Sequence, residues 1–167
     1  MKKIVLILLF LAACGRDDAP ADNRSAADSP AAAPGSKSSR ARSPGAENRL
    51  AGLYEGGAGA QKNQLCIVEK GKGAQFGLIV WGGNLHSCSG AGEAVRSGER
   101  LTLKMAGDEA CTIEASLKGG AVALPATVPE GCAYYCGAGT TLAGAKFTRS
   151  GDEVEKATDI AGDPLCD

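Results

Sequence analysis

The sequence predicts a mainly β fold, a small antiparallel sandwich or barrel stabilised by disulfides, that follows a disordered tether. Short apolar runs recur between glycine-containing turns from residue 49 onward, a pattern typical of antiparallel sheets. Glycine supplies 21 of the 119 residues from 49 to 167. This density disfavours long helices, because each interior glycine costs about 1 kcal/mol relative to alanine. Six cysteines in the same region predict disulfides.

The predicted strands are short and rich in aliphatic residues. They are residues 53–55, 64–70, 75–81, 93–96, 100–105, 110–116, 121–124 and 145–149. Turns are expected at residues 71–73, 97–99 and 118–120, where glycine can adopt a positive φ. The region 129–144 fits a strand pattern poorly, and we expect a short helical or irregular segment at 136–142.

One hairpin is predicted with a defined buried face. Residues 100–105 alternate with a period of two, so that Leu101, Leu103 and Met105 share one face. Residues 111–116 repeat this alternation, and residues 107–109 form a plausible tight turn between the two runs. With only seven aromatic residues in the chain, we expect the core to consist of aliphatic side chains together with Phe76, Trp81, Phe147 and the tyrosines.

The first 13 residues have the organisation of an export signal. Lys2 and Lys3 precede an unbroken apolar run, residues 4–11, and two small residues, Ala12 and Ala13, follow it. The apolar run is far shorter than the roughly 20 residues that a helix needs to cross a bilayer. The sequence therefore predicts a cleaved signal peptide at residues 1–13.

The end of this segment, Leu11-Ala12-Ala13-Cys14, resembles the lipobox of bacterial lipoprotein precursors. The resemblance covers the first 14 residues. It implies that diacylglycerol is attached to Cys14, that the chain is cleaved before this residue, and that further acylation with palmitate-type chains follows. Several acyl chains on one residue anchor a protein stably to a membrane. In a host with two membranes, Gly15 after the lipidated cysteine implies the outer membrane.

Residues 14–48 are predicted to be the lipidated cysteine and a disordered tether. From Gly15 to Asn48, 22 of 34 residues are Ala, Ser, Pro or Gly, and none is Val, Ile, Leu, Met or aromatic. Such a segment cannot bury enough apolar surface to offset the entropy of ordering. As a flexible coil it spans roughly 30 Å.

Residues 49–167 are predicted to form a single disulfide-bonded β domain. The chain has seven cysteines, and lipidation of Cys14 leaves an even set of six: Cys66, Cys88, Cys111, Cys132, Cys136 and Cys166. These allow 15 pairings. We predict that neighbours along the chain pair, Cys66 with Cys88, Cys111 with Cys132 and Cys136 with Cys166. Zinc is the competing interpretation, but no C-x2-C pair exists and the chain has one histidine.

Three features bear on chemistry, and each has a structural interpretation that we prefer. His86 lies two residues before Cys88, as a catalytic base could, but Cys88 is expected to be oxidised. Residues 152–167 are acidic, but they lack a calcium-loop pattern, so we expect a solvated tail fastened by Cys166. Tyr134 and Tyr135 lie between two cysteines; we expect both in the core, with the alternative that one contacts a partner.

The function predicted is that of a membrane-anchored envelope lipoprotein with a non-catalytic binding or inhibitor domain facing the periplasm or cell surface. No catalytic residues, metal site or cofactor are predicted. The expected partners are the lipid bilayer, through acylated Cys14, and an envelope protein or polymer. The region 49–167 has 11 basic and 14 acidic residues, which gives no reason to expect nucleic acid. The alternatives are a structural envelope lipoprotein without a soluble partner and an envelope hydrolase.

The predicted architecture resembles that of membrane-bound lysozyme inhibitors, in which a lipid anchor carries a small disulfide-bonded β-barrel. This resemblance makes an inhibitor one concrete form of the binding domain. The Ser-Gly-x-x-Tyr type of loop of that family is not present, since Ser89-Gly90 leads to Glu93 and Ser97-Gly98 leads to Leu101.

Overall fold

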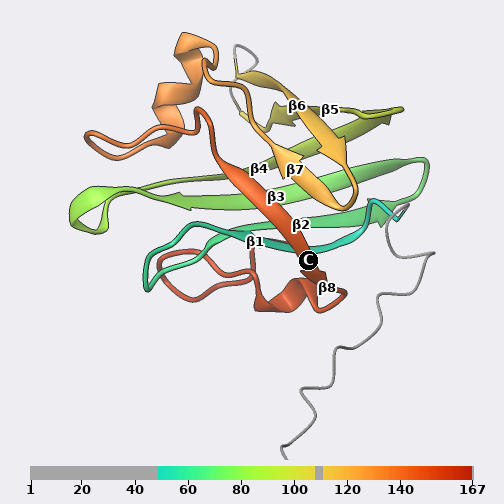
Figure 1. Cartoon of the computed structure of the whole chain (residues 1–167), viewed down its shortest axis with the longest axis horizontal. Coiled ribbons are helices and arrows are strands. Elements are labelled where there is room, and N and C mark those ends of the chain that lie inside the picture. Colours follow the sequence, from blue (N-terminus) through green and yellow to red (C-terminus); the bar gives the residue numbers. More distant parts are fainter. Residues whose placement is uncertain (1–48, 108–110, 167) are drawn as a thin grey trace, which may run out of the picture. The chain divides into compact units, whose positions relative to one another are not determined.

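The computed structural model describes residues 49–107 and 111–166, and these form a closed eight-stranded barrel (Figure 1). Each strand pairs antiparallel with the next strand in the sequence, and β8 pairs with β1 to close the sheet. The strands are β1 (Gly52–Gly56), β2 (Asn63–Lys70), β3 (Gly73–Trp81), β4 (Ser87–Ser97), β5 (Arg100–Met105), β6 (Thr112–Lys118), β7 (Ala121–Ala123) and β8 (Lys146–Gly151). The predicted mainly β antiparallel fold is confirmed, in its barrel form.

Each predicted strand corresponds to an observed one, and the largest difference is in β4. This strand begins at Ser87, whereas the sequence predicted residues 93–96. The added part consists of serine, cysteine, glycine and alanine, which have weak strand preference. Its pairing with β3, from Trp81↔Ser87 to Ala74↔Ala94, makes it a strand. The helical elements of the described residues are three short 3-10 segments, η1 (Gly83–Leu85), η2 (Glu130–Tyr135) and η3 (Val154–Lys156). No helix in the described ranges is long and apolar enough to cross a membrane.

The barrel interior is filled by side chains from alternating positions of the strands. The predicted hairpin is present, with Leu103 opposite Ile113, and Leu101, Leu103 and Met105 are buried as expected. The turn predicted at 107–109 falls mostly on residues outside the described ranges. The largest fully buried side chains include Tyr54, Phe76 and Phe147.

Trp81 was predicted to lie in the core, and this is wrong. It is the last residue of β3 and is only half-buried. Phe76, Leu78 and Val80 belong to the interior cluster, so alternation along β3 directs Trp81 to the outer face. Because residues 78–81 at the end of β3 are apolar on both faces, their sequence pattern does not reveal which side chains point inward.

The two ends of the barrel differ in their connections, and Figure 1 shows them at opposite sides of the molecule. We call one the turn end: residues 71–72, 98–99 and 119–120 form its tight turns, at the predicted positions, and the chain enters there at Arg49. We call the other the loop end: residues 57–62, 82–86, 106–111 and 124–145 connect strands there.

The segment that follows β8 packs on the outside of the barrel. Leu53 of β1 and Cys66 of β2 form a second apolar cluster with Ala157 and Cys166. A Cβ atom on Gly77 would lie 2.2 Å from the carbonyl oxygen of Leu165, so this glycine is what lets the segment lie against β3. The predicted acidic tail is thus fastened by Cys166, and it also covers an apolar surface.

Three disulfides are present, and two of the predicted pairings are wrong. Cys111 is bonded to Cys132 as predicted, but Cys66 is bonded to Cys166 and Cys88 to Cys136. Cys66 belongs to the outer cluster, whereas Cys88 belongs to the interior cluster. The two therefore lie on opposite faces of the sheet, which prevents the bond that their spacing suggested.

Candidate functional site

The loop end carries the longest connection of the barrel, residues 124–145, which includes η2. Two disulfides hold this connection to the barrel, one to Cys88 at the start of β4 and one to Cys111 just before β6. The hydroxyl of Tyr135 donates a hydrogen bond of 2.7 Å to the carbonyl oxygen of Ala106. Three separate links therefore fix η2 over this end of the barrel.

The loop 82–86 lies beside the residues that follow η2. The amide of Gly137 donates a hydrogen bond of 2.8 Å to the carbonyl oxygen of Ser87. A Cβ atom on Gly137 would lie 3.2 Å from Nδ1 of His86, and one on Gly82 would lie 2.6 Å from Oγ1 of Thr140. The two loops therefore form a continuous surface.

Loop 82–86 has an unusual backbone. Asn84 and Leu85 have φ angles of 55° and 61° and are the non-glycine residues with positive φ in the described part of the chain. Asparagine tolerates this conformation, but for leucine it is unfavourable by about 1–2 kcal/mol. The turn is closed by a hydrogen bond of 2.8 Å from the Gly82 amide to the carbonyl oxygen of His86. This closure holds the Leu85 side chain in the solvent, where 72% of the residue is exposed.

Tyr134 and Tyr135 have different environments. Tyr134 is 80% exposed, whereas Tyr135 is half-buried and packs against the interior cluster. Their rings meet edge to face, with centroids 5.2 Å apart. The expectation that both lie in the core is wrong, because the 3-10 turn of η2 points successive side chains in different directions. The alternative, one packed tyrosine and one exposed tyrosine, is what the structure contains.

Several of the predicted site residues are structural or lie outside the described ranges. Cys88 is disulfide-bonded, so it supplies no thiol to the exposed His86. Within residues 49–107 and 111–166, no group of three His, Cys, Asp or Glu side chains could hold a metal ion. Cys14, the predicted signal peptide and the predicted tether lie outside the described residues. Sequence reasoning missed Leu85, because a lone leucine near a turn is ordinarily a core residue.

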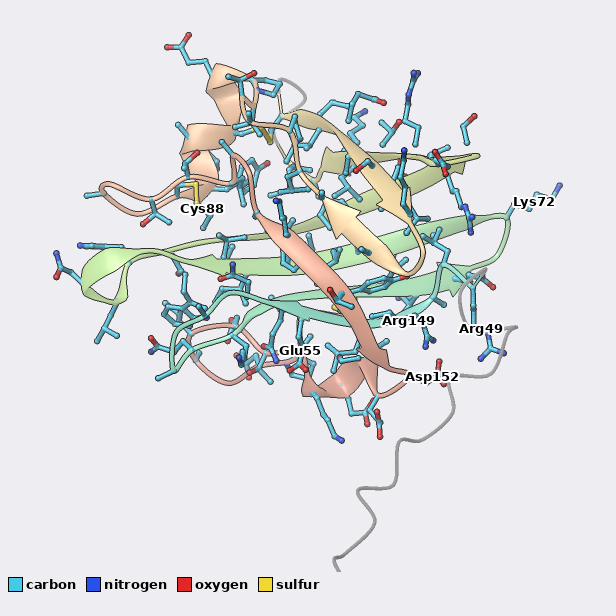
Figure 2. The ribbon with its side chains drawn as sticks, viewed as in Figure 1. Arg49, Glu55, Lys72, Cys88, Arg149 and Asp152 are labelled. Atoms are coloured by element: carbon cyan, nitrogen blue, oxygen red, sulfur yellow. A yellow bond between two sulfur atoms is a disulfide. The ribbon has the colours of Figure 1, made fainter. Side chains whose placement is uncertain are left out.

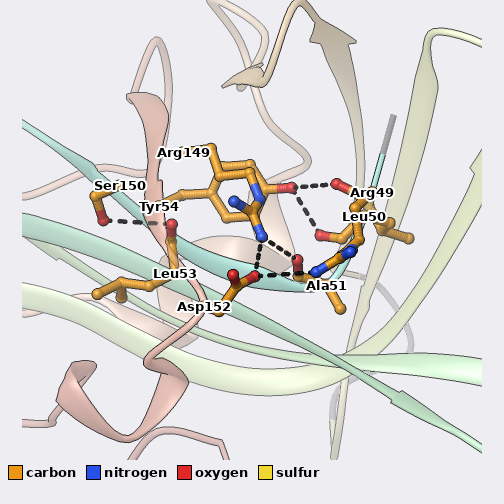
Figure 3. A network of polar contacts seen from close by, with 8 residues as sticks. All are labelled: Arg49, Leu50, Ala51, Leu53, Tyr54, Arg149, Ser150 and Asp152. Atoms are coloured by element: carbon orange, nitrogen blue, oxygen red, sulfur yellow. Dashed lines mark hydrogen bonds and ion pairs between the residues drawn. The ribbon is translucent and has the colours of Figure 1, made fainter. Parts of the chain in front are cut away.

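The turn end is closed by a polar network around Tyr54 and Arg149 (Figure 3). The fully buried Tyr54 donates a hydrogen bond of 2.7 Å from its hydroxyl to the carbonyl oxygen of Leu50. Arg149 donates one of 3.0 Å to the carbonyl oxygen of Ala51 and also pairs with Asp152. Arg49 approaches the same carboxylate at 3.6 Å. These contacts fix the entering chain, residues 49–51, to the end of β8.

Burial affects the pKa of Tyr54, and close packing places Arg149 against Gly52. Burial raises the pKa of Tyr54 above its ordinary value of 10.0, although the nearby charges of Arg149 and Arg96 act in the opposite direction. Gly52 is the residue that makes room for the guanidinium, since a Cβ atom there would lie 2.8 Å from a terminal nitrogen of Arg149. The Arg149 side chain is thus packed into the turn end of the barrel, which we call the barrel floor where Leu50, Tyr54 and Arg149 close it.

Comparison of the chain with protein-family models gives no match, and comparisons with curated proteins and with solved structures give none either.

Proposed function

We propose that this chain is an envelope lipoprotein, anchored through acylated Cys14, whose barrel is a non-catalytic module that binds or inhibits a partner outside the cytoplasm. The lipobox and the tether support the anchor, and three disulfides fit an oxidising compartment. The binding surface in this proposal is the loop end, centred on Leu85 and Tyr134.

One observation carries the proposal: Leu85 and Tyr134 are both largely exposed on two adjoining, rigidly held loops. Exposed tyrosines on a rigid support supply large contact areas at low entropic cost, which is why they recur in binding surfaces. The loop end also lies opposite Arg49, where the chain enters the barrel. A partner that binds these loops therefore contacts the end of the barrel opposite the point at which the chain enters it.

The backbone of Leu85 supports the same surface. Unfavourable conformations persist where the surrounding structure enforces them, and they cluster at binding and active sites. A glycine at this position would adopt the same φ without cost, yet leucine is present and its side chain contributes little to the core. Contact between this apolar side chain and a partner would explain why leucine occupies the position.

The test is capture from an envelope extract with the chain from residue 14 onward as bait, Cys14 being replaced by serine. Lysozyme is tested separately as a defined protein partner, because the architecture resembles that of membrane-bound lysozyme inhibitors. We expect the bait to retain a protein or polymer that the double variant Leu85→Gly/Tyr134→Ala loses. Truncation of such central contacts typically weakens binding by 2 kcal/mol or more, about 30-fold.

The matched control is Val95→Ala, which removes another exposed apolar side chain, 62% exposed, from the opposite half of β4. It should leave capture unchanged. Capture that is equally strong with the double variant would contradict the assignment of the loop end. If no partner is captured, the structural alternative gains support, and turnover of an envelope substrate would support the hydrolase.

A further inference from the structure

Basic side chains gather at the turn end of the barrel. Its turns, the adjoining strand ends and the entering chain carry Arg49, Lys70, Lys72, Arg96, Arg100, Lys118 and Arg149. The acidic residues of the same region are Glu69, Glu99, Asp152 and Glu153, together with Glu114, whose carboxylate pairs with Arg100. Seven basic residues against five acidic ones leave an excess of two positive charges there, although the whole chain has a formal net charge of −1.

The ion pairs of this end do not remove the excess. Arg49 and Arg149 share the carboxylate of Asp152, so two positive charges meet one negative charge. Lys118 pairs with Glu99 at 3.2 Å and Arg100 pairs with Glu114 at 3.6 Å, but the side chains of both pairs are largely exposed, and such pairs are strongly screened by water. Figure 2 shows Lys72 projecting from the tip of the β2–β3 turn, away from the barrel.

We infer that the turn end is a contact surface for the anionic phospholipid headgroups of the membrane that carries the anchor. The inference rests on the lipid anchor of the proposed function. The chain enters the barrel at Arg49, within this surface, so the tether leads from the basic end toward Cys14. A basic surface and anionic headgroups are complementary in charge, and each Lys or Arg near such a surface strengthens binding about fivefold.

A weak attraction is sufficient because the anchor confines the barrel near the bilayer. A short flexible linker gives an effective concentration in the millimolar range. The contact then sets an orientation: with the turn end on the headgroups, Leu85 and Tyr134 at the loop end point away from the membrane. In this arrangement the tether sets how far the barrel can move from the bilayer, and the basic turn end sets its orientation when it contacts the headgroups.

The experiment is lysine footprinting of the complete acylated protein, purified from its host membrane and reconstituted in vesicles. One set of vesicles contains phosphatidylglycerol and phosphatidylethanolamine at 3:7, and the other contains phosphatidylcholine alone. An acetylating reagent should modify Lys70, Lys72 and Lys118 about fivefold more slowly on the anionic vesicles at low salt. The difference should disappear at high salt, where charges are screened. Lys62 and Lys146, at the loop end, should react equally in all cases.

Charge-reversal variants provide the matched comparison, with Lys70 as the reporter. Lys72→Glu/Lys118→Glu should abolish the protection of Lys70, whereas Lys62→Glu/Lys146→Glu changes the net charge equally and should preserve it. Equal labelling of both ends on anionic vesicles would overturn the inference, as would equal protection on phosphatidylcholine. Mass spectrometry of the N-terminal peptide checks Cys14 acylation independently, so failure of the anchor is distinguished from failure of the contact.

Discussion

The two ends of this barrel are built on different principles. At the turn end, tight turns connect the strands, and the floor is formed by Leu50, Tyr54 and Arg149, which bond to one another or to nearby backbone. At the loop end, the long connection 124–145 has little regular structure, and two disulfides hold it in place. Covalent links are thus found where hydrogen-bonded strands do not constrain the chain. This arrangement leaves the loop end free to present exposed side chains on a rigid frame.

The largest expected effect is at the loop end, on removal of the disulfide between Cys88 and Cys136. The double variant Cys88→Ala/Cys136→Ala should lower the free energy of unfolding by about 4 kcal/mol, because the bond closes a loop of 48 residues. Chemical denaturation measures the change. If the loop end is the binding surface, this double variant should also fail to capture the partner.

The control for this variant is Cys66→Ala/Cys166→Ala, which releases the C-terminal segment from the outer face. It should destabilise the protein to a similar degree but leave capture intact at temperatures where the barrel stays folded. Loss of capture by both variants would show that stability alone, and not the arrangement of the loop end, controls binding.

At the turn end, Arg149→Met should lower the free energy of unfolding by about 2 kcal/mol. The Arg149 side chain is 12% exposed, and its guanidinium bonds to Ala51 and Asp152; charged hydrogen bonds of this kind contribute roughly 1.5–3 kcal/mol. Arg100→Met is the control, since the pair of Arg100 with Glu114 is largely exposed and should contribute less than about 0.5 kcal/mol. Similar losses for both variants would contradict a special role for Arg149.

A pair of tyrosine variants compares the two ends directly. Tyr54→Phe should cost about 1 kcal/mol, because the Leu50 carbonyl loses its buried donor. Tyr134→Phe should change stability by less than about 0.5 kcal/mol, since its ring is in solvent. Denaturation curves of the two variants and the parent protein decide the point, and a larger cost for Tyr134→Phe would reverse our description of the ends.

The raised pKa of Tyr54 predicts that the stability of the parent protein depends on pH in a way that the stability of Tyr54→Phe does not. Because burial raises this pKa in the folded state, folding favours the neutral hydroxyl. Its contribution to stability is complete below about pH 10, the unfolded value, and is lost as the pH rises through the higher folded pKa. Thermal unfolding between pH 8 and pH 11.5 should show a steeper loss for the parent protein than for Tyr54→Phe. Parallel curves would contradict the raised pKa.

The smallest expected effect is a gain in stability. Leu85→Gly should raise the free energy of unfolding by about 0.5–1 kcal/mol, because glycine adopts a φ of 61° without steric cost. The same variant should bind the partner less well. A destabilised Leu85→Gly protein would mean that the leucine side chain supports the fold instead of serving the surface.

The local sequence was sufficient to predict the tight turns and the strands apart from the first half of β4. Alternation in residues 100–105 and 111–116 identified both strands of a hairpin and the face that each one buries. Glycines at 71, 98 and 119 marked the turns, each with a positive φ. These features depend on neighbouring residues alone, since strand period and turn geometry are local properties.

Closure of the sheet decided the remaining features. The sequence contained all six cysteines of the disulfides, but the partners of Cys66 and Cys88 depend on which face of the barrel each occupies. The outward position of Trp81 and the basic turn end have the same origin. Period-two alternation places residues on two faces, but only the curved and closed sheet makes one face the interior, and only its topology gathers distant turns at one end.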